Sequence, residues 1–147
     1  MPVSIRDAAL ADIPAILIIE QAAPSAAHWS AEQYQTRIVD GSVIVAEEEG
    51  KVCGFLCARV VAGEWEIENV VVDEKFRRHG IAAALMRALL AKWEAASGAA
   101  VLLEVRESNI AARAFYEASG FSQVGHRRSY YREPAEDALL YARYRRT

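Results

Sequence analysis

The order of apolar and polar residues in the first part of the chain predicts one short strand followed by two helices. The strand covers residues 3–6. In the first helix Asp12 can cap the amino terminus, and Pro14 is tolerated because the N–H that proline lacks would have no partner in the first turn. The second helix is predicted over residues 30–39.

Three β-rich runs follow, over residues 42–47, 52–61 and 64–72. Turn-prone segments separate them and predict an antiparallel meander. Within the third run, glutamates alternate with other residues as far as residue 68, and valines then occupy residues 70–72. Alternation predicts a half-exposed strand and a continuous apolar run a buried one, so we expect this strand to become fully buried toward its end.

The most regular pattern in the chain is that of an amphipathic helix. Its large apolar residues recur at helical spacing: Ile81, Leu85, Leu89 and Trp93. Gly98 follows them and suits the left-handed position that commonly ends a helix. The spacing therefore predicts a long helix that begins near residue 81 and ends before Gly98.

The remaining elements complete an α+β pattern. A strand is predicted over residues 101–106, followed by a helix that Ser108 caps and that stops at Gly120. Two last strands are predicted over residues 121–129 and 138–145. We expect an α+β fold with a mixed, mostly antiparallel sheet of about seven strands flanked by about four helices.

Composition narrows the class of protein. The chain has 147 residues, of which 53% are hydrophobic and 25% charged, which is typical of one globular domain over residues 1–147. It has no apolar run of about 18 residues, and its first residues lack the pattern of a signal peptide. We therefore expect a cytoplasmic protein without a membrane partner, as a monomer or a weak dimer.

The net charge of −3 argues against direct nucleic-acid binding by the whole domain. Arginines nevertheless gather near the carboxyl terminus: Arg127, Arg128, Arg132, Arg143, Arg145 and Arg146. They indicate either a solvated strand edge or a surface for an anionic partner or substrate.

Metal binding, disulfide formation and covalent catalysis are not indicated. Cys53 and Cys57 fall in one predicted strand, where their Cα atoms would lie roughly 13 Å apart, too far for a disulfide. Two thiols without a nearby Cys or His partner cannot build a closed metal site, so we expect no metal. His28 and His79 belong to no Ser/His/Asp or Cys/His pattern.

The most informative motif precedes the amphipathic helix: Arg77, Arg78, His79, Gly80, Ile81, Ala82 and Ala83. The first N–H groups of a helix have no intrahelical partner and carry the positive end of its dipole, so a helix start binds phosphate. Gly80 lets the backbone approach an anion, and an arginine adds charge-assisted hydrogen bonds. The motif predicts a pyrophosphate site; a plain loop with a helix-start glycine is the alternative.

This motif resembles the Arg/Gln-x-x-Gly-x-Gly/Ala signature of the GNAT superfamily of N-acetyltransferases, with Ala82 in place of the second glycine. The order of predicted elements matches that fold. Three further segments, 103–109, 115–121 and 127–131, are similar to the RimI family of bacterial ribosomal-protein-alanine acetyltransferases. The resemblance implies that acetyl-CoA is the acetyl donor and lies in a gap between the strand ending at Val72 and the strand ending near Arg106.

The resemblance also implies which residues bind acetyl-CoA. The pantetheine arm is expected along one strand and the pyrophosphate at the helix start, with two further contacts from a later helix. The expected contacts are Val70, Val71, Val72, Arg77, Arg78, His79, Gly80, Ile81, Ala82, Ala83, Asn109 and Tyr116.

Glu104 is the candidate general base. This carboxylate interrupts an apolar run over residues 101–105, where a charge is costly unless it is solvated, paired or functional. An α-amine with a pKa near 8 is mostly protonated at neutral pH, so a base beside the acceptor is useful. The resemblance assigns the base to the matching glutamate of the family. An ion pair with Arg106 or Arg113 is the alternative for Glu104.

Two carboxylates on the third β-rich run are rival bases. Other members of the superfamily use a carboxylate on this strand, which would be Glu66 or Glu68 here, although a solvated strand face also explains both. The backbone N–H of Val71 or Val72 could polarise the acetyl carbonyl where the strands splay apart.

Tyr116 is the candidate acid. It lies seven residues after Asn109, so the two share one helical face. A phenol with a pKa near 10 can protonate a leaving thiolate, and the matching tyrosine of the family has that role. The alternative is a core aromatic beside Phe115.

The acceptor implied by the resemblance is a protein N-terminus, with a ribosomal protein beginning in Ala or Ser as the family default. Candidate acceptor-binding residues are Trp29, Glu68, Asn69, Tyr130, Tyr131 and Asp137, with Tyr34 and Glu136 as further candidates. Residues 24–28 match the family less well. A small-molecule amine acceptor is one alternative, and a non-catalytic acyl-CoA-binding or ribosome-associated module is another.

Overall fold

The structure, a computed structural model, describes residues 3–23, 26–132 and 134–146. One mixed sheet has the strand order β1-β2-β3-β4-β5-β7-β6, in which only the β4–β5 pair is parallel. The strands are β1 Ser4–Asp7, β2 Ser42–Glu48, β3 Lys51–Val61, β4 Glu64–Val72, β5 Ala100–Arg106, β6 Ser122–Arg132 and β7 Ala135–Tyr144. The predicted α+β class and mostly antiparallel sheet are confirmed.

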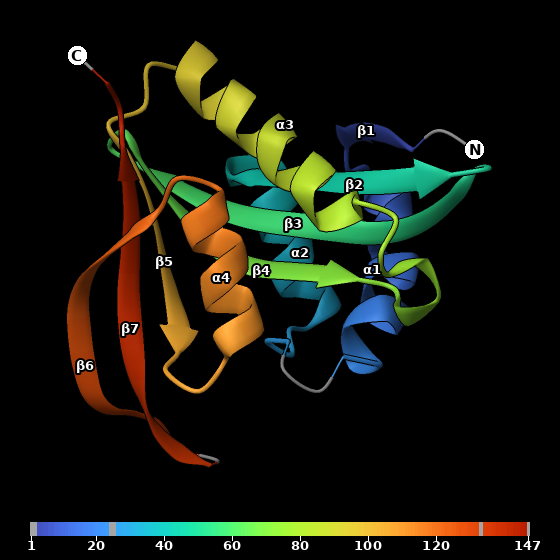
Figure 1. Ribbon diagram of the computed structural model, residues 1–147. Coiled ribbons are helices and arrows are strands. Elements are labelled where there is room, and N and C mark those ends of the chain that lie inside the picture. Colours follow the sequence, from blue (N-terminus) through green and yellow to red (C-terminus); the bar gives the residue numbers. More distant parts are fainter. Residues whose placement is uncertain (1–2, 24–25, 133, 147) are drawn as a thin grey trace.

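Helices cover both faces of this sheet. They are α1 Ile13–Gln21, α2 Ala31–Asp40, α3 Ile81–Ala95 and α4 Ile110–Ala118, with short 3-10 turns at Leu10–Asp12 and Glu74–Phe76. α1 and α2 lie behind the sheet, whereas α3 and α4 lie in front of it (Figure 1). Within the described residues, none of the helices combines the length and apolar character that crossing a bilayer requires.

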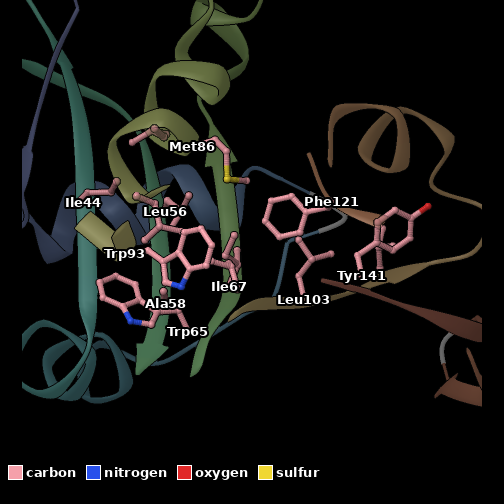
Figure 2. Close-up of a cluster of buried hydrophobic side chains, with 14 of the residues drawn as sticks. Ile44, Leu56, Ala58, Trp65, Ile67, Met86, Trp93, Leu103, Phe121 and Tyr141 are labelled. Carbon is pink, nitrogen blue, oxygen red and sulfur yellow. The ribbon is translucent and has the colours of Figure 1, made fainter. Parts of the chain in front are cut away.

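Two hydrophobic cores fill the spaces between these layers. The core on the α3 and α4 side includes Leu56, Trp93 and Leu103, and Figure 2 shows its aromatic centre. The core on the α1 and α2 side includes Ile16 and Phe55. Neighbouring residues of β3 point to opposite faces, so this central strand contributes to both cores. Each fully buried large side chain contributes roughly 1.5–3 kcal/mol.

Cys53 and Cys57 are separated by these same layers. Both thiols are free and buried, Cys53 in the core beneath α3 and Cys57 in the core beneath α1 and α2. Lying on opposite faces of the sheet, they do not form the same site.

β4 carries one extra residue at its middle. Cys57 of β3 pairs with Asn69, and the next residue of β3, Ala58, pairs with Ile67, which leaves Glu68 as a β-bulge. The bulge shifts the alternation of the strand by one residue. Ile67 therefore belongs to the core beneath α3, whereas Val71 belongs to the core beneath α1 and α2.

Three predictions about helix ends are wrong. Asp12 does not cap α1, because its carboxylate instead accepts hydrogen bonds from the Ala9 N–H at 2.7 Å and from Arg6 at 2.8 and 2.9 Å. The cap of α4 is Asn109 rather than Ser108, and the Asn109 side chain accepts from the Ala112 N–H at 3.1 Å.

The third error concerns the end of α3. The left-handed residue there is Ser97, with φ 56°, and not Gly98. Gly98 has a different reason to lack a side chain, since a Cβ would lie 2.1 Å from Trp93 Cδ1. The glycine therefore serves the packing of the core and not the turn.

Candidate active site

A cleft opens where β4 and β5 stop pairing. Their parallel register runs from Glu64–Ala100 to Ile67–Leu103, and the bulge at Glu68 follows directly. Beyond this point the two strands point in different directions (Figure 1). A cavity of about 700 Å³ lies between them, lined by both strands, by α4 and by the segment before α2.

The cleft side of β4 is a row of backbone groups. The Asp73 N–H donates to the Cys53 carbonyl of β3 at 2.8 Å. Alternate residues of an antiparallel strand direct their N–H groups to the same side, so Val71 also points its N–H at β3. Val70 and Val72 point theirs toward the cleft. Of the two predicted carbonyl-polarising donors, Val72 therefore faces the cleft and Val71 does not.

The cleft leaves some side chains at the end of β4 partly exposed. Val70 and Val72 are half-buried, while Val71 between them is buried. The prediction of a fully buried strand end is wrong, because the parallel neighbour that would cover Val70 and Val72 has turned away.

The predicted pyrophosphate site is a left-handed loop that leads into α3. Arg78 and Gly80 have φ values of 69° and 73°, and Gly80 is the residue immediately before the helix. A Cβ on Gly80 would meet no described atom within 4 Å, so the glycine is required by its backbone conformation and the space above it is open. The first-turn N–H groups of α3 face this loop.

The side chains of this motif divide between the loop and the core. Arg77 lines the cavity, and Arg78 and His79 are exposed. Ile81 is buried beneath β3, so only its backbone can meet a ligand, and Ala82 is half-buried on the first turn. Ala83 lines a second groove, on the α4 side of α3.

α4 brings Asn109 and Tyr116 to the same cavity. The ring of Tyr116 packs against Phe121 and Tyr141, at centroid distances of 6.0 and 6.5 Å. Burial raises the pKa of Tyr116 to about 12, so the phenol keeps its proton at neutral pH. Asn109 uses its side-chain oxygen to cap α4.

Glu104 projects from β5 into the cavity with its side chain 21% exposed. Arg127 Nη1 of β6 lies 3.6 Å from Glu104 Oε1, a loose ion pair. A hydrogen bond with Glu104 raises the pKa of Tyr130. Arg113, one predicted partner, instead binds the Tyr141 hydroxyl and the Glu107 carbonyl.

The rival carboxylates on β4 are held by arginines. Arg59 Nη2 donates to Glu66 Oε1 at 2.8 Å. Arg37 of α2 binds both oxygens of Glu68, at 2.6 and 3.2 Å. Both rival carboxylates are therefore held by an arginine at hydrogen-bond distance, whereas the Arg127 guanidinium stays 3.6 Å from Glu104.

Five of the six candidate acceptor residues line the cavity: Trp29, Glu68, Asn69, Tyr130 and Tyr131. The two tyrosines are covered by arginines, with Arg106 4.2 Å from the Tyr131 ring centre and Arg127 5.3 Å from that of Tyr130. Aromatic and cationic groups therefore form the β6 side of the cleft.

The structure places the other candidates elsewhere. Asp137 accepts from the Ser129 N–H at 2.7 Å and contacts His126 at 2.7 Å, and it does not line the cavity. Glu136 accepts from the Ser108 N–H and from Arg106. Tyr34 is fully buried beneath Trp29 and is not a lining residue. Pro24 and Ser25 lie outside the described residues.

Sequence reasoning missed the partners that hold these groups. Arg37 and Arg127 are ordinary arginines in the sequence, and their carboxylates lie 31 and 23 positions away. No local pattern marks such pairs. The sequence contains one sign of the bulge at Glu68, the change from alternating residues to consecutive valines at residues 70–72.

Comparison with known proteins gives a consistent result. Residues 12–121 match the family model described as Acetyltransferase (GNAT) family. The [ribosomal protein bS18]-alanine N-acetyltransferase of Escherichia coli (strain K12) is 35% identical over 134 residues, 89% of this chain and 90% of the relative. The N-alpha-acetyltransferase RimI of Mycobacterium tuberculosis is 42% identical over 80 residues, 54% of this chain and 49% of the relative.

Solved structures show the same arrangement of elements. The ribosomal-protein-S18-alanine N-acetyltransferase from Escherichia coli superposes with a TM-score of 0.88 and 32% identity, covering 97% of this chain and 94% of the other. Ard1 from Thermoplasma volcanium gives a TM-score of 0.91 at 27% identity, over all of both chains.

Proposed function

The chain belongs to the acetyltransferase (GNAT) family and is an acetyl-CoA-dependent N-acetyltransferase, and we propose that it acetylates the N-terminal α-amine of a protein. The observation that carries the proposal is the cleft at the β4 bulge. One cavity there is lined by a carboxylate, a protonated phenol and a strand whose backbone N–H groups are turned toward it. The name of the Escherichia coli relative, a ribosomal-protein-alanine acetyltransferase, supports a protein N-terminus beginning in Ala.

In the proposed complex acetyl-CoA enters between β4 and β5. Its pyrophosphate binds the left-handed loop and first turn of α3, with Arg77 and Arg78 adding positive charge. The pantetheine amides pair with the cleft side of β4 through Val72, as an added strand would. Acetyl-CoA would thus pair with the edge of β4 that β5 leaves unpaired.

The reaction proposed in this cleft is direct transfer. The neutral amine attacks the thioester carbonyl carbon, and the Val70 N–H, the cleft-facing donor farther from the pyrophosphate loop, stabilises the oxyanion that forms. Glu104 takes the proton that the amine nitrogen loses, directly or through one water. The C–S bond then breaks, and Tyr116 gives its proton to the departing sulfur.

A panel of peptides tests the acceptor assignment. Peptides that differ only in the first residue, together with free alanine and a simple polyamine, are incubated with enzyme and acetyl-CoA, and intact masses are measured. We expect one added acetyl group on peptides beginning in Ala or Ser, and none when the same peptide is already N-terminally blocked. Acetylation of the small amines alone would contradict the proposal.

A further inference from the structure

The wall of the cleft that faces the acceptor is held by a buried polar network. Glu20 of α1 is 1% exposed and Tyr34 of α2 is fully buried. Glu20 Oε1 accepts two hydrogen bonds, from the Trp29 N–H at 2.5 Å and from the Tyr34 hydroxyl at 2.9 Å. The network continues to Asn69, whose side-chain nitrogen donates to the Tyr34 oxygen at 3.2 Å and to the Ala27 carbonyl at 3.1 Å.

The direction of these hydrogen bonds follows from the groups themselves. A carboxylate and a carbonyl can only accept, and a phenol has one proton to give. Tyr34 gives that proton to Glu20, so it must accept from Asn69. Both N–H groups of the Asn69 amide are then used, which leaves its oxygen for any ligand in the cavity.

The network connects four separate parts of the chain. Asn69 directly follows the bulge of β4, Glu20 lies on α1 and Tyr34 on α2, and in the segment between the two helices the Trp29 N–H donates and the Ala27 carbonyl accepts. Residues 26, 27 and 29 and Asn69 all line the cavity. The acceptor side of the cleft is thereby fixed to the strand on the cofactor side.

Two neighbouring side chains contact the ring of Trp29. It packs on Tyr34 at a centroid distance of 5.2 Å, and the guanidinium of Arg37 lies 5.6 Å from its ring centre. Arg37 is itself fixed by two bonds to Glu68. The backbone and the side chain of Trp29 are therefore both held by residues that do not line the cavity: Glu20, Tyr34 and Arg37.

A buried carboxylate that binds two neutral donors is costly, because it loses the solvation of its charge. Packing alone would be satisfied by an apolar residue at this position. From the network we infer that Glu20 and Tyr34 are positioning residues that preform the acceptor wall, an inference that rests on the proposed function. They act through Trp29 and Asn69 and not on the substrate itself.

Tyr34→Phe tests this inference, because it removes only the hydroxyl. We expect the KM for the acceptor peptide to rise about 10-fold, as for the loss of one hydrogen bond of about 1.4 kcal/mol, while the KM for acetyl-CoA changes by less than about 2-fold. Glu20→Ala should raise the acceptor KM further. Glu20→Gln keeps an oxygen that accepts both bonds and should recover most of the loss.

The chain offers a matched control in Tyr141→Phe. Tyr141 is equally buried, and its hydroxyl also binds a carboxylate, Glu117 Oε2 at 2.7 Å, but it lies on β7 away from the segment before α2. Loss of the Tyr141 hydroxyl should not change the ratio of the KM for the acceptor peptide to the KM for acetyl-CoA. Equal shifts of both KM values in Tyr34→Phe, or no shift in either, would overturn the inference.

Hydrogen exchange separates this inference from the proposed function. The Trp29 amide donates to Glu20, so exchange at residues 26–29 should be at least about 10-fold faster in Tyr34→Phe than in the unmodified protein. If no amine is acetylated, the proposed function fails, and exchange still decides whether Glu20 and Tyr34 hold this segment. Unchanged exchange would show that they do not.

Discussion

The two strands that form the cleft contribute to it in opposite ways. β4 has its two cavity-lining carboxylates, Glu66 and Glu68, bound to Arg59 and Arg37, and it offers backbone N–H groups. β5 is paired with β7 along its whole length, from Ala100–Tyr144 to Arg106–Ala138, and offers the side chain of Glu104. A backbone contact does not depend on which residue carries it, whereas a side-chain contact does. Substitutions should therefore affect β5 through chemistry and β4 through backbone geometry.

The largest expected effect is on the β5 side. Glu104→Gln keeps the size of the side chain but removes the base, so kcat with a peptide acceptor should fall by roughly 10²- to 10⁴-fold. Glu66→Gln, on β4 beside the same cavity, is the matched control and should cost less than about 10-fold, because Glu66 is tied to Arg59. Steady-state rates of both variants give the comparison. Equal losses of kcat in the two variants would contradict the assignment of Glu104 as the base.

On β4 the sharpest test uses proline, which removes an N–H. Val70→Pro should remain folded, since this N–H points into the cleft, but should lose about 10²- to 10³-fold in kcat as an oxyanion donor disappears. Val71→Pro removes a bond to β3 and leaves a carbonyl there unpaired, at a cost of about 1–3 kcal/mol in stability. Thermal unfolding and turnover of the two variants are compared. If Val70→Pro is as unstable as Val71→Pro, the assigned directions of the N–H groups are wrong.

A smaller effect is expected at the loop before α3, which continues the β4 side. Arg78→Glu should weaken coenzyme A binding by about 10- to 100-fold, because a charge-assisted hydrogen bond to phosphate is lost and repulsion is added. Arg87→Glu, an exposed arginine further along α3, should leave the affinity within about 2-fold. Calorimetric titration with coenzyme A measures both. An unchanged affinity in Arg78→Glu would contradict the assignment of a phosphate site to this loop.

The smallest change in rate is expected at alkaline pH, which tests the role of Tyr116, on the β5 side of the cleft, as the acid. The rate should rise as an acceptor amine with a pKa of about 8 loses its proton, and then stay level. Tyr116 acts in its protonated form, so activity is lost only as pH passes its own pKa. Burial raises that pKa to about 12, which moves the loss above the ordinary tyrosine value of about 10. A fall centred near pH 10 in kcat/KM would contradict this role.

Local patterns in the sequence were sufficient for most of the fold. The spacing of Ile81, Leu85, Leu89 and Trp93 predicts α3 correctly, and the turn signals predict the meander of β2, β3 and β4. Helix ends were less predictable, because Asp12 binds Arg6 and Gly98 makes room for Trp93. Those roles depend on contacts that no short stretch of sequence displays.

The candidate site divides in the same way. Arg77 was predicted from the loop motif, and Asn109 and Tyr116 from the family resemblance, and all three line one cavity. The pairs that restrain the rival carboxylates, and the network from Glu20 to Asn69, join residues far apart in the sequence. Pairing of this kind follows from how α1 and α2 pack on the sheet and from the register of its strands, which no short stretch of sequence shows.

The bulge at Glu68 has an evolutionary consequence. Deleting this one codon would make the pairs Ala58–Ile67 and Cys57–Asn69 consecutive, so the later residues of β4 would keep their faces, but the bulge at which β4 and β5 part would be lost. Natural selection should therefore remove insertions and deletions at this position far more strictly than substitutions. Insertions and deletions among relatives should accumulate in hairpin tips such as residues 49–50, and spare this strand.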